Sequence, residues 1–217
     1  MDSGAWDERY AAKDLVWGGE PNRWVAREVA EITPARALDL AAGEGRNTLW
    51  LAARGWRVTA VDFSRVALER GRRRAAELAP RAAERIRWVR ADLLEYAPAE
   101  GSYELVVVAY LHLPGEERRR VLRRAAAALA AGGELLVVGH DSANLTEGTG
   151  GPQEPRVLFT AEDVLADLAD APLETVRAER VRRPVAQEEG PPKEAIDALA
   201  RLRRTARGVP RDPSALV

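Results

Sequence analysis

The residues best suited to chemistry lie around a short glycine loop that joins a predicted strand to a predicted helix. Residues 37–50 read Ala-Leu-Asp-Leu-Ala-Ala-Gly-Glu-Gly-Arg-Asn-Thr-Leu-Trp, and Gly43 and Gly45 let a ligand approach the backbone at the helix N-terminus. Asp62 follows 17 residues after Gly45, at the end of the next predicted strand. A carboxylate there can accept hydrogen bonds from both hydroxyls of a ribose. The spacing therefore predicts a nucleoside site.

Two details distinguish this loop from one that binds a dinucleotide. The third glycine of the G-x-G-x-x-G pattern is Thr48 in this chain, which suits a pyrophosphate less well. Asp39 lies in the strand just before the loop, where its charge would repel a pyrophosphate and attract an ammonium group. Both details favour an amino acid attached to adenosine. An NAD(P)-dependent oxidoreductase stays open as the alternative.

The two histidines of the chain form a second group of reactive side chains. His112 follows the predicted strand 103–110, and His140 ends the predicted strand 133–140. Because the carboxyl ends of parallel strands meet at one edge of a sheet, both imidazoles should face the ligand crevice. Either could act as a general base, or could simply bond to the backbone at a strand end.

The elements that must position these residues alternate along the chain. Short β-rich runs alternate with longer segments rich in Ala, Arg and Glu, which predicts an α/β fold with a parallel sheet and helices on both faces. The predicted strands are 36–42, 57–63, 86–93, 103–110 and 133–140. One predicted helix spans 65–79 after the N-cap Ser64. A second has Glu116 and Glu117 in its first turn and runs to Ala131, where Gly132 and Gly133 end it. A third begins after the N-cap Thr160, with Asp163 at the capping-box position.

The two ends of the chain flank this core as parts of one domain of 217 residues. Residues 1–34 predict an N-terminal helical cap with helices at 3–12 and 22–32, and residues 35–141 predict the ligand-binding core. Residues 142–155 are rich in Gly and polar residues and predict a lid or substrate loop. Residues 174–185 and 195–204 predict a terminal hairpin around a turn at 188–192. The last segment also fits a helix, but Glu-Glu-Gly-Pro-Pro favours a turn between strands.

Four segments in this order resemble the successive motifs of class I S-adenosylmethionine-dependent methyltransferases. They are Leu-Asp-Leu-Ala-Ala-Gly-Glu-Gly-Arg from Leu38, Val-Thr-Ala-Val-Asp-Phe-Ser from Val58, Val-Arg-Ala-Asp-Leu from Val89 and Tyr-Glu-Leu-Val-Val-Val from Tyr103. The resemblance spans about residues 35–140 and departs at Ala41 and Ala42, where the family has a glycine and a cysteine. It implies a Rossmann-like, doubly wound seven-stranded sheet with an antiparallel last strand. It also implies S-adenosyl-L-methionine as cofactor and S-adenosyl-L-homocysteine as product.

The resemblance assigns the cofactor to residues at the strand ends. They are Asp39, Ala41, Gly43, Glu44 and Gly45 for the methionine moiety, Asp62 for the ribose, Phe63 and Asp92 for the adenine with the backbone of Leu93, and Ala109 with Tyr110 for the methyl side. A lone Asp at a strand end is often only a cap, and Phe63 also fits a helix staple. The joint placement of Asp39, Asp62 and Asp92 at three strand ends favours binding.

Missing residue types narrow the methyl acceptor. In the family that the chain resembles, methylation at carbon 5 of a pyrimidine uses a cysteine nucleophile, and the chain has no Cys. Methylation of ribose uses a Lys-Asp-Lys-Glu tetrad, and the only lysines, Lys13 and Lys193, are too far apart in the sequence to supply it. A small-molecule acceptor is left, and segments near Trp6 and Pro21 resemble the branch that includes tellurite-resistance and thiol methyltransferases. The expected catalytic residues are His140, His112 and Tyr110, and the expected substrate-binding residues are Trp17, Arg23, Arg46 and Asp141.

Composition excludes several classes of partner. The net charge is −1, so the Arg-rich clusters at 70–74, 118–124 and 201–207 are interpreted as solvated faces and no nucleic-acid partner is expected. No apolar run is long enough for a membrane span or a signal peptide, which predicts a cytoplasmic protein. With no Cys and two His, no metal site is expected. A cofactor-binding module without turnover stays open as a third alternative.

Overall fold

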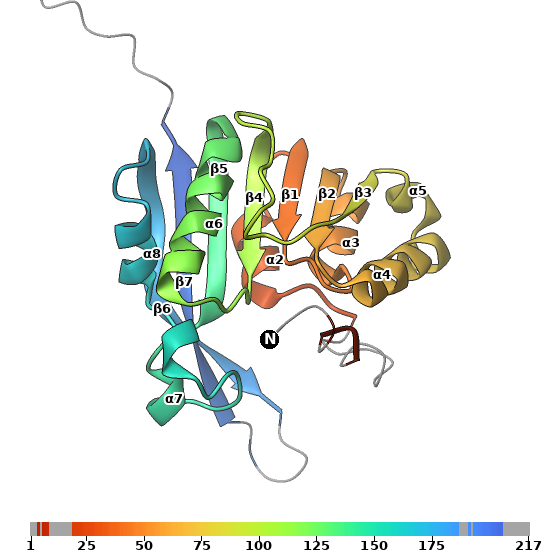
Figure 1. Ribbon diagram of the computed structural model, residues 1–217. Helices are drawn as coiled ribbons and strands as arrows, with labels where there is room; N and C mark the ends of the chain where they lie inside the picture. Colours follow the sequence, from red (N-terminus) through yellow and green to blue (C-terminus); the bar gives the residue numbers. More distant parts are fainter. Residues whose placement is uncertain (1–3, 5, 9–18, 187–190, 192, 206–217) are drawn as a thin grey trace, which may run out of the picture.

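The computed structural model describes residues 4, 6–8, 19–186, 191 and 193–205, and its centre is a seven-stranded sheet in the order β3-β2-β1-β4-β5-β7-β6 (Figure 1). The strands are β1 Arg36–Leu40, β2 Arg57–Asp62, β3 Ile86–Arg90, β4 Tyr103–Ala109, β5 Leu129–His140, β6 Leu173–Val185 and β7 Lys193–Arg204. Strands β1 to β5 pair in parallel, and β7 runs antiparallel to both β5 and β6. The expected sheet with its antiparallel last strand is confirmed. The strand order reverses between β1 and β4, where ligands bind in such sheets.

Helices cover both faces of the sheet. They are α2 Arg23–Val29, α3 Arg46–Ala53, α4 Arg65–Leu78, α5 Pro80–Ala83, α6 Gly115–Ala128, α7 Asn144–Glu147 and α8 Ala161–Asp167, with a 3₁₀ turn at Pro155–Val157. In Figure 1, α6 and α8 lie in front of the sheet and α2 and α3 behind it. Each face has its own buried apolar cluster, one with Leu122 and Phe159 and the other with Trp24 and Leu51.

The helix starts follow the predicted capping residues. Ser64 Oγ accepts the backbone N–H of Ala67 at 3.1 Å, and Thr160 and Asp163 form the reciprocal capping box at the start of α8. Helix α2 starts one residue later than expected because Asn22 is its N-cap and accepts the N–H groups of Trp24 and Val25. It ends at Val29, three residues before the expected end.

The boundary between α6 and β5 differs from the prediction. Helix α6 ends at Ala128 instead of Ala131, and β5 begins at Leu129 instead of Gly133. The carbonyl of Ala128 accepts the N–H of Ser102, and Leu129 pairs with Tyr103 of β4. Contacts with a distant segment therefore stop the helix before the two glycines do.

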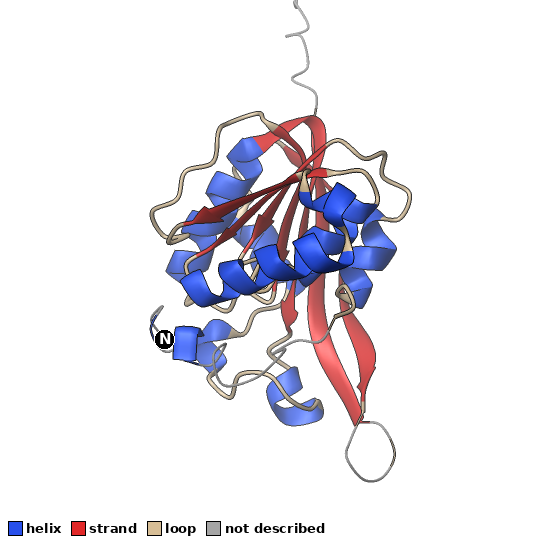
Figure 2. Cartoon of the chain, turned by 90° about the vertical axis from the view of Figure 1, so that its right-hand side faces the viewer, coloured by secondary structure: helices blue, strands red, loops and turns tan. Residues whose placement is uncertain are grey.

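The two C-terminal strands form a long hairpin that projects beyond the helical layers, with α7 beside it (Figure 2). The strand interpretation of residues 195–204 is confirmed, because β7 pairs with both of its neighbours along its length. The loop expected at 142–155 contains the single-turn helix α7. The predicted turn at 188–192 lies outside the described residues apart from Pro191, and of the predicted helix at 3–12 only residues 4 and 6–8 are described, as helical.

A search of the described residues for a helix with the length and hydropathy of a membrane span finds none.

Candidate active site

The glycine loop between β1 and α3 has an unusual backbone. Ala41, Gly43 and Gly45 have φ angles of +60°, +55° and +77°. The left-handed conformation costs an L-residue about 1–2 kcal/mol, so Ala41 is strained where the family has a glycine. The substitution of this glycine by alanine is therefore costlier than the side-chain size alone suggests.

Gly45 has a packing role in addition to its place in the turn. A Cβ atom at Gly45 would run into the indole of Trp88, which comes from β3, and a Cβ at Gly71 of α4 would meet the same ring. Because Gly45 has no side chain, the indole of Trp88 from the sheet can pack against it. Gly45 is needed both for the turn and for the fit between α3, α4 and β3.

Asp39 is a buried carboxylate beside the loop. Its Oδ2 accepts a hydrogen bond from the Thr48 hydroxyl at 2.6 Å. Burial raises the pKa of Asp39 to about 6, against the opposing effects of Thr48 and Arg46, while the nearby Asp62 raises it further. A cationic group at this point would restore the charge of the carboxylate.

Asp62 ties the end of β2 to the glycine loop. Its Oδ2 accepts the N–H of Gly43 at 2.8 Å and its Oδ1 accepts the N–H of Ser64 at 2.9 Å. Burial raises the pKa of Asp62, and these backbone hydrogen bonds oppose the rise. Each carboxylate oxygen has a second lone pair, so Asp62 can hold the loop and still accept ligand hydroxyls.

The third acidic residue occupies a more open position. Asp62 pairs in register with Arg90, and Asp92 follows two residues later at the same edge. Asp92 is exposed, and its Oδ1 accepts the N–H of Leu94 at 2.9 Å. Phe63 and Leu93 are half-buried. Asp39 and Asp62 thus lie in the last two residues of β1 and β2, and Asp92 follows the neighbouring strand β3.

Tyr110, His112 and His140 form one cluster of rings at the ends of β4 and β5. The His112 and His140 rings stack at 5.3 Å between centroids with an interplanar angle of 18°, and the Tyr110 ring meets His140 edge-on at 5.1 Å. Tyr110 has φ +58°, an outlier for a bulky residue, and its N–H donates to Val138 O at 2.7 Å. Ala109, the last residue of β4, pairs with Val138 of β5.

The histidines have different partners. His112 Nε2 accepts the backbone N–H of His140 at 3.2 Å, and burial, reinforced by His140, lowers the pKa of His112 to about 4. Burial also lowers the pKa of His140, although Asp197 opposes this. Both imidazoles are therefore neutral at pH 7.

Asp197 of β7 is a site residue that the sequence analysis missed. Its Oδ2 accepts hydrogen bonds from Tyr110 OH at 2.8 Å, Trp24 Nε1 at 3.0 Å and Arg183 Nε at 2.8 Å. The signal available in the sequence was an acidic residue between Ile196 and Ala198 in an otherwise apolar stretch. Its position opposite His140 became visible only with the register of β5 and β7.

The expected substrate residues are scattered. Arg23 is exposed, with its guanidinium 5.2 Å from the centre of the Trp24 ring. Arg46 is half-buried at the start of α3 and acts electrostatically on Asp39. Asp141 is buried, accepts the N–H of Ala143 and forms an ion pair with Arg180 at 3.2 Å. Trp17 lies outside the described residues.

The loop after β5 is anchored next to the ring cluster. Asn144 is buried; its Oδ1 accepts the N–H of Ile196 at 2.7 Å and its Nδ2 donates to Gly150 O at 2.8 Å. A Cβ at Gly151 would lie 2.6 Å from Cδ2 and 2.7 Å from Nε2 of His140. The backbone at Gly151 therefore covers the His140 ring.

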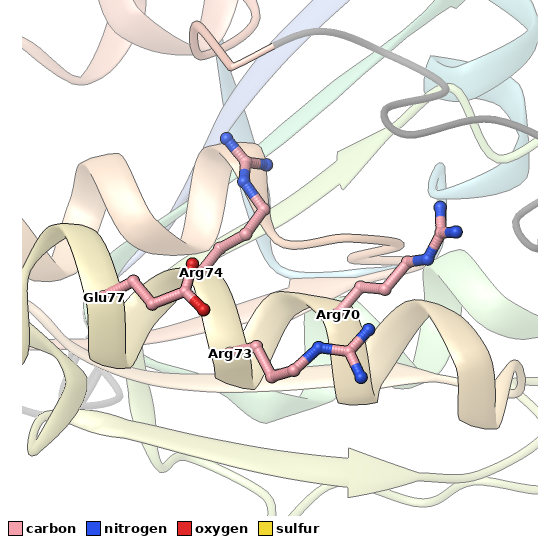
Figure 3. A pocket seen from close by; sticks show the side chains of 4 residues that line it. All are labelled: Arg70, Arg73, Arg74 and Glu77. Carbon is pink, nitrogen blue, oxygen red and sulfur yellow. The ribbon is translucent and has the colours of Figure 1, made fainter.

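A shallow hollow on α4 is lined by Arg70, Arg73, Arg74 and Glu77 (Figure 3). The guanidinium groups diverge instead of converging on one point. Arg70 forms an ion pair with Glu44 of the glycine loop at 3.3 Å. Arginines in the other two clusters also meet carboxylates: Arg118 pairs with Asp167 and Arg203 with Glu134. Much of the basic charge is thus neutralised within the chain.

Comparison with known proteins relates part of the chain to methyltransferases. A methyltransferase domain model matches residues 37–133. The match covers less than half of the chain, and the sheet topology agrees with the Rossmann-like fold that the resemblance to class I S-adenosylmethionine-dependent methyltransferases implies.

Individual proteins similar to this chain share between 19% and 36% of their aligned residues with it. The demethylmenaquinone methyltransferase of Clavibacter sepedonicus is 36% identical over 115 residues, which make up 50% of this chain and 45% of that protein. The N-methyltransferase NodS from Bradyrhizobium japonicum WM9, solved with S-adenosyl-L-homocysteine, has a TM-score of 0.69 and 23% identity and covers 95% of this chain and 100% of its own. An enzyme that converts a disulfide bond into a thioacetal group during echinomycin biosynthesis has a TM-score of 0.71 and 19% identity, over 95% of this chain and 94% of its own. The two structural likenesses support the fold, and the resemblance to tellurite-resistance enzymes stays a prediction.

Proposed function

We propose that this chain transfers a methyl group from S-adenosyl-L-methionine to a small-molecule acceptor by in-line displacement. The cofactor supplies a methyl group activated by a positively charged sulfur. The donor set fits such a molecule: Asp39 offers a buried carboxylate for the ammonium group, and Asp62 offers free lone pairs for the ribose hydroxyls. The backbone of the loop Gly43–Gly45, between these two carboxylates in the sequence, would contact the methionine moiety.

The residues that would contact the adenine and the methyl group of the cofactor lie along the same edge of the sheet. Asp92, Leu93 and Phe63 follow β3 and β2 and would flank the adenine. Ala109 ends β4 and Tyr110 follows it, on the other side of β1 from β2, because β4 and β2 are the two neighbours of β1. The transferred methyl group would then lie near the ring cluster of Tyr110, His112 and His140.

The observation that carries the proposal is the strained backbone of Tyr110. A bulky residue with φ +58° costs free energy, and such outliers occur preferentially at functional sites. Here the strain directs the Tyr110 hydroxyl to Asp197 and its ring to His140. We assign His140 as the candidate base and His112 as its backbone support, because His112 Nε2 already accepts an N–H.

The enclosure of the ring cluster favours a small acceptor. The backbone at Gly151 covers His140, and buried Asp141 starts the loop that brings it there. Trp24 donates to Asp197 beside the cluster and has Arg23 over its ring, and Arg46 acts electrostatically on Asp39. The name of the Clavibacter sepedonicus relative, demethylmenaquinone methyltransferase, also points to a ring-containing small molecule as acceptor.

Isothermal titration calorimetry with S-adenosyl-L-homocysteine tests the proposal. We expect the purified chain to bind it and Asp62→Ala to weaken binding severely, while Glu95→Ala, an exposed acidic residue near the same edge, leaves it unchanged. Binding of NADH without S-adenosyl-L-homocysteine would favour the oxidoreductase alternative. Binding without methyl transfer to a panel of phenols, thiols and amines would favour a module without turnover.

A further inference from the structure

Two buried polar atoms without a hydrogen-bond partner in the described residues face each other at the ring cluster. They are Nδ1 of His140 and Oδ1 of Asp197, and they lie 3.5 Å apart. The two residues are directly opposite in the antiparallel register of β5 and β7. Buried polar groups rarely lack partners, and these two can satisfy each other by a small closure of this gap.

Asp197 is fixed for this role by its other oxygen. Trp24, Tyr110 and Arg183 all donate to Oδ2, from three different elements of the fold. The side chain is completely buried, and the Arg183 ion pair compensates its charge. Oδ1 is therefore a rigidly held acceptor that is directed only at His140.

We propose that Asp197 is a positioning residue that holds the His140 imidazole with its proton on Nδ1, so that Nε2 is the general base of methyl transfer. An imidazole whose Nδ1–H donates to a buried carboxylate has one orientation and one tautomer, and its opposite nitrogen has a free lone pair. The stacked His112 ring limits its tilt from the side. This inference rests on the proposed function, because it presumes methyl transfer at this cluster.

A base in this position points to a class of acceptor. The acceptor oxygen forms a bond to the methyl carbon while the bond from carbon to the sulfonium sulfur breaks and its electron pair stays on sulfur. When the loop at Gly151 opens, the hydroxyl proton passes to Nε2 of His140 and then to solvent. A thiolate has already lost its proton and gains little from such a base, whereas a phenol or enol gains much. The geometry therefore favours a phenolic or enolic hydroxyl as acceptor.

The charged and titratable groups that face His140 are Asp197, Arg183, His112 and Tyr110. Burial and Arg183 lower the pKa of His140, and Asp197 raises it. Removing the charge of Asp197 should therefore lower the pKa of His140 further. This direction is opposite to the rise in pKa that would follow if the variant simply let water reach the ring.

Nitrogen-15 NMR of the imidazoles tests the inference without an acceptor, because the chain has only two histidines. In the wild type we expect His140, assigned by its loss in His140→Gln, to be protonated on Nδ1 and unprotonated on Nε2 at pH 7. In Asp197→Asn we expect a mixed or reversed tautomer and a lower titration midpoint. A wild-type His140 protonated on Nε2, or an unchanged tautomer in Asp197→Asn, overturns the inference. The wild-type measurement decides even if the variant does not fold.

Glu134→Gln is the matched control. Glu134 is also a buried acid beside β7 that bonds to arginines, but it lies at the other end of the β5–β7 pairing from His140. Glu134→Gln should leave both imidazole tautomers unchanged.

A second experiment compares methyl transfer to phenols, catechols and enols with transfer to thiols of matched shape. Asp197→Asn should slow transfer to hydroxyls by about 10²- to 10⁴-fold and to thiols by less than about tenfold. Transfer to thiols alone overturns the acceptor class. If the wild type does not bind S-adenosyl-L-homocysteine, the proposed function is overturned instead.

Discussion

The indole of Trp88 fills the space that a side chain at Gly45 would need. Gly45→Ala therefore combines a clash with Trp88 and an unfavourable φ of +77°. Overpacking costs about 1–3 kcal/mol and left-handed strain about 1–2 kcal/mol, so we expect the free energy of unfolding to fall by roughly 2–5 kcal/mol. Urea denaturation followed by circular dichroism measures this loss.

Gly101→Ala is the matched control for Gly45→Ala. Gly101 also has a positive φ, +63°, but no described atom lies within 4 Å of a Cβ built there. Its substitution should cost only the conformational strain, about 1–2 kcal/mol. Equal losses in the two variants would contradict a packing role for Gly45. Combining Gly45→Ala with Trp88→Leu should recover part of the loss.

Ala41→Gly should stabilise the chain. Ala41 has φ +60°, a conformation that glycine adopts without a steric penalty. We expect a gain of about 0.5–1 kcal/mol, after the entropy cost of glycine in the unfolded chain, which corresponds to a melting temperature higher by roughly 1–4 °C. Ala42→Gly, whose φ is not positive, should instead destabilise the chain. A gain in both variants, or in neither, would count against strain at Ala41.

Binding of S-adenosyl-L-homocysteine should depend on pH through Asp39. The pKa of Asp39 is about 6 in the ligand-free chain, and an ammonium group beside it would lower that value. Binding near pH 6 should therefore release protons, and affinity should rise from pH 5 to pH 7 by up to about tenfold per pH unit below the pKa of Asp39. Affinity is lost as the pH falls because the carboxyl must then ionise before it can hold the cation.

Calorimetry in buffers of different ionisation enthalpy measures this proton release. Asp39→Asn removes the titrating group, so its weaker binding should vary little between pH 5 and 7. An equal pH dependence in the wild type and in Asp39→Asn would assign the effect to another group, of which Asp62 is the nearest candidate.

Asn144 should control the opening of the loop over His140. In Asn144→Ala the buried N–H of Ile196 loses its acceptor and Gly150 loses its donor. An unsatisfied buried donor costs about 1–3 kcal/mol, and we expect faster hydrogen–deuterium exchange at residues 148–151. Gln153→Ala, at an exposed position in the same loop, should leave exchange there unchanged. Equal exchange in all three proteins would show that Asn144 does not hold the loop.

The sequence predicted the parts of the fold that depend on local patterns. Capping by Ser64 and Thr160 involves residues a few positions apart, and the apolar run of β4 already indicates a strand buried on both faces. The end of α6 was misplaced because the carbonyl of Ala128 bonds to Ser102, a contact that no window around the helix contains.

The same distinction holds for the candidate site. The sequence by itself determined the glycine loop and the acidic residues Asp39 and Asp62, because the carboxyl ends of parallel strands must meet at one edge of the sheet. Only the tertiary structure decided that Trp88 packs on Gly45 and that Asp197 faces His140. Asp197 follows His140 by 57 positions, and the antiparallel register of β5 and β7 brings them together. That register results from pairing across the whole sheet, which no local pattern of residues encodes.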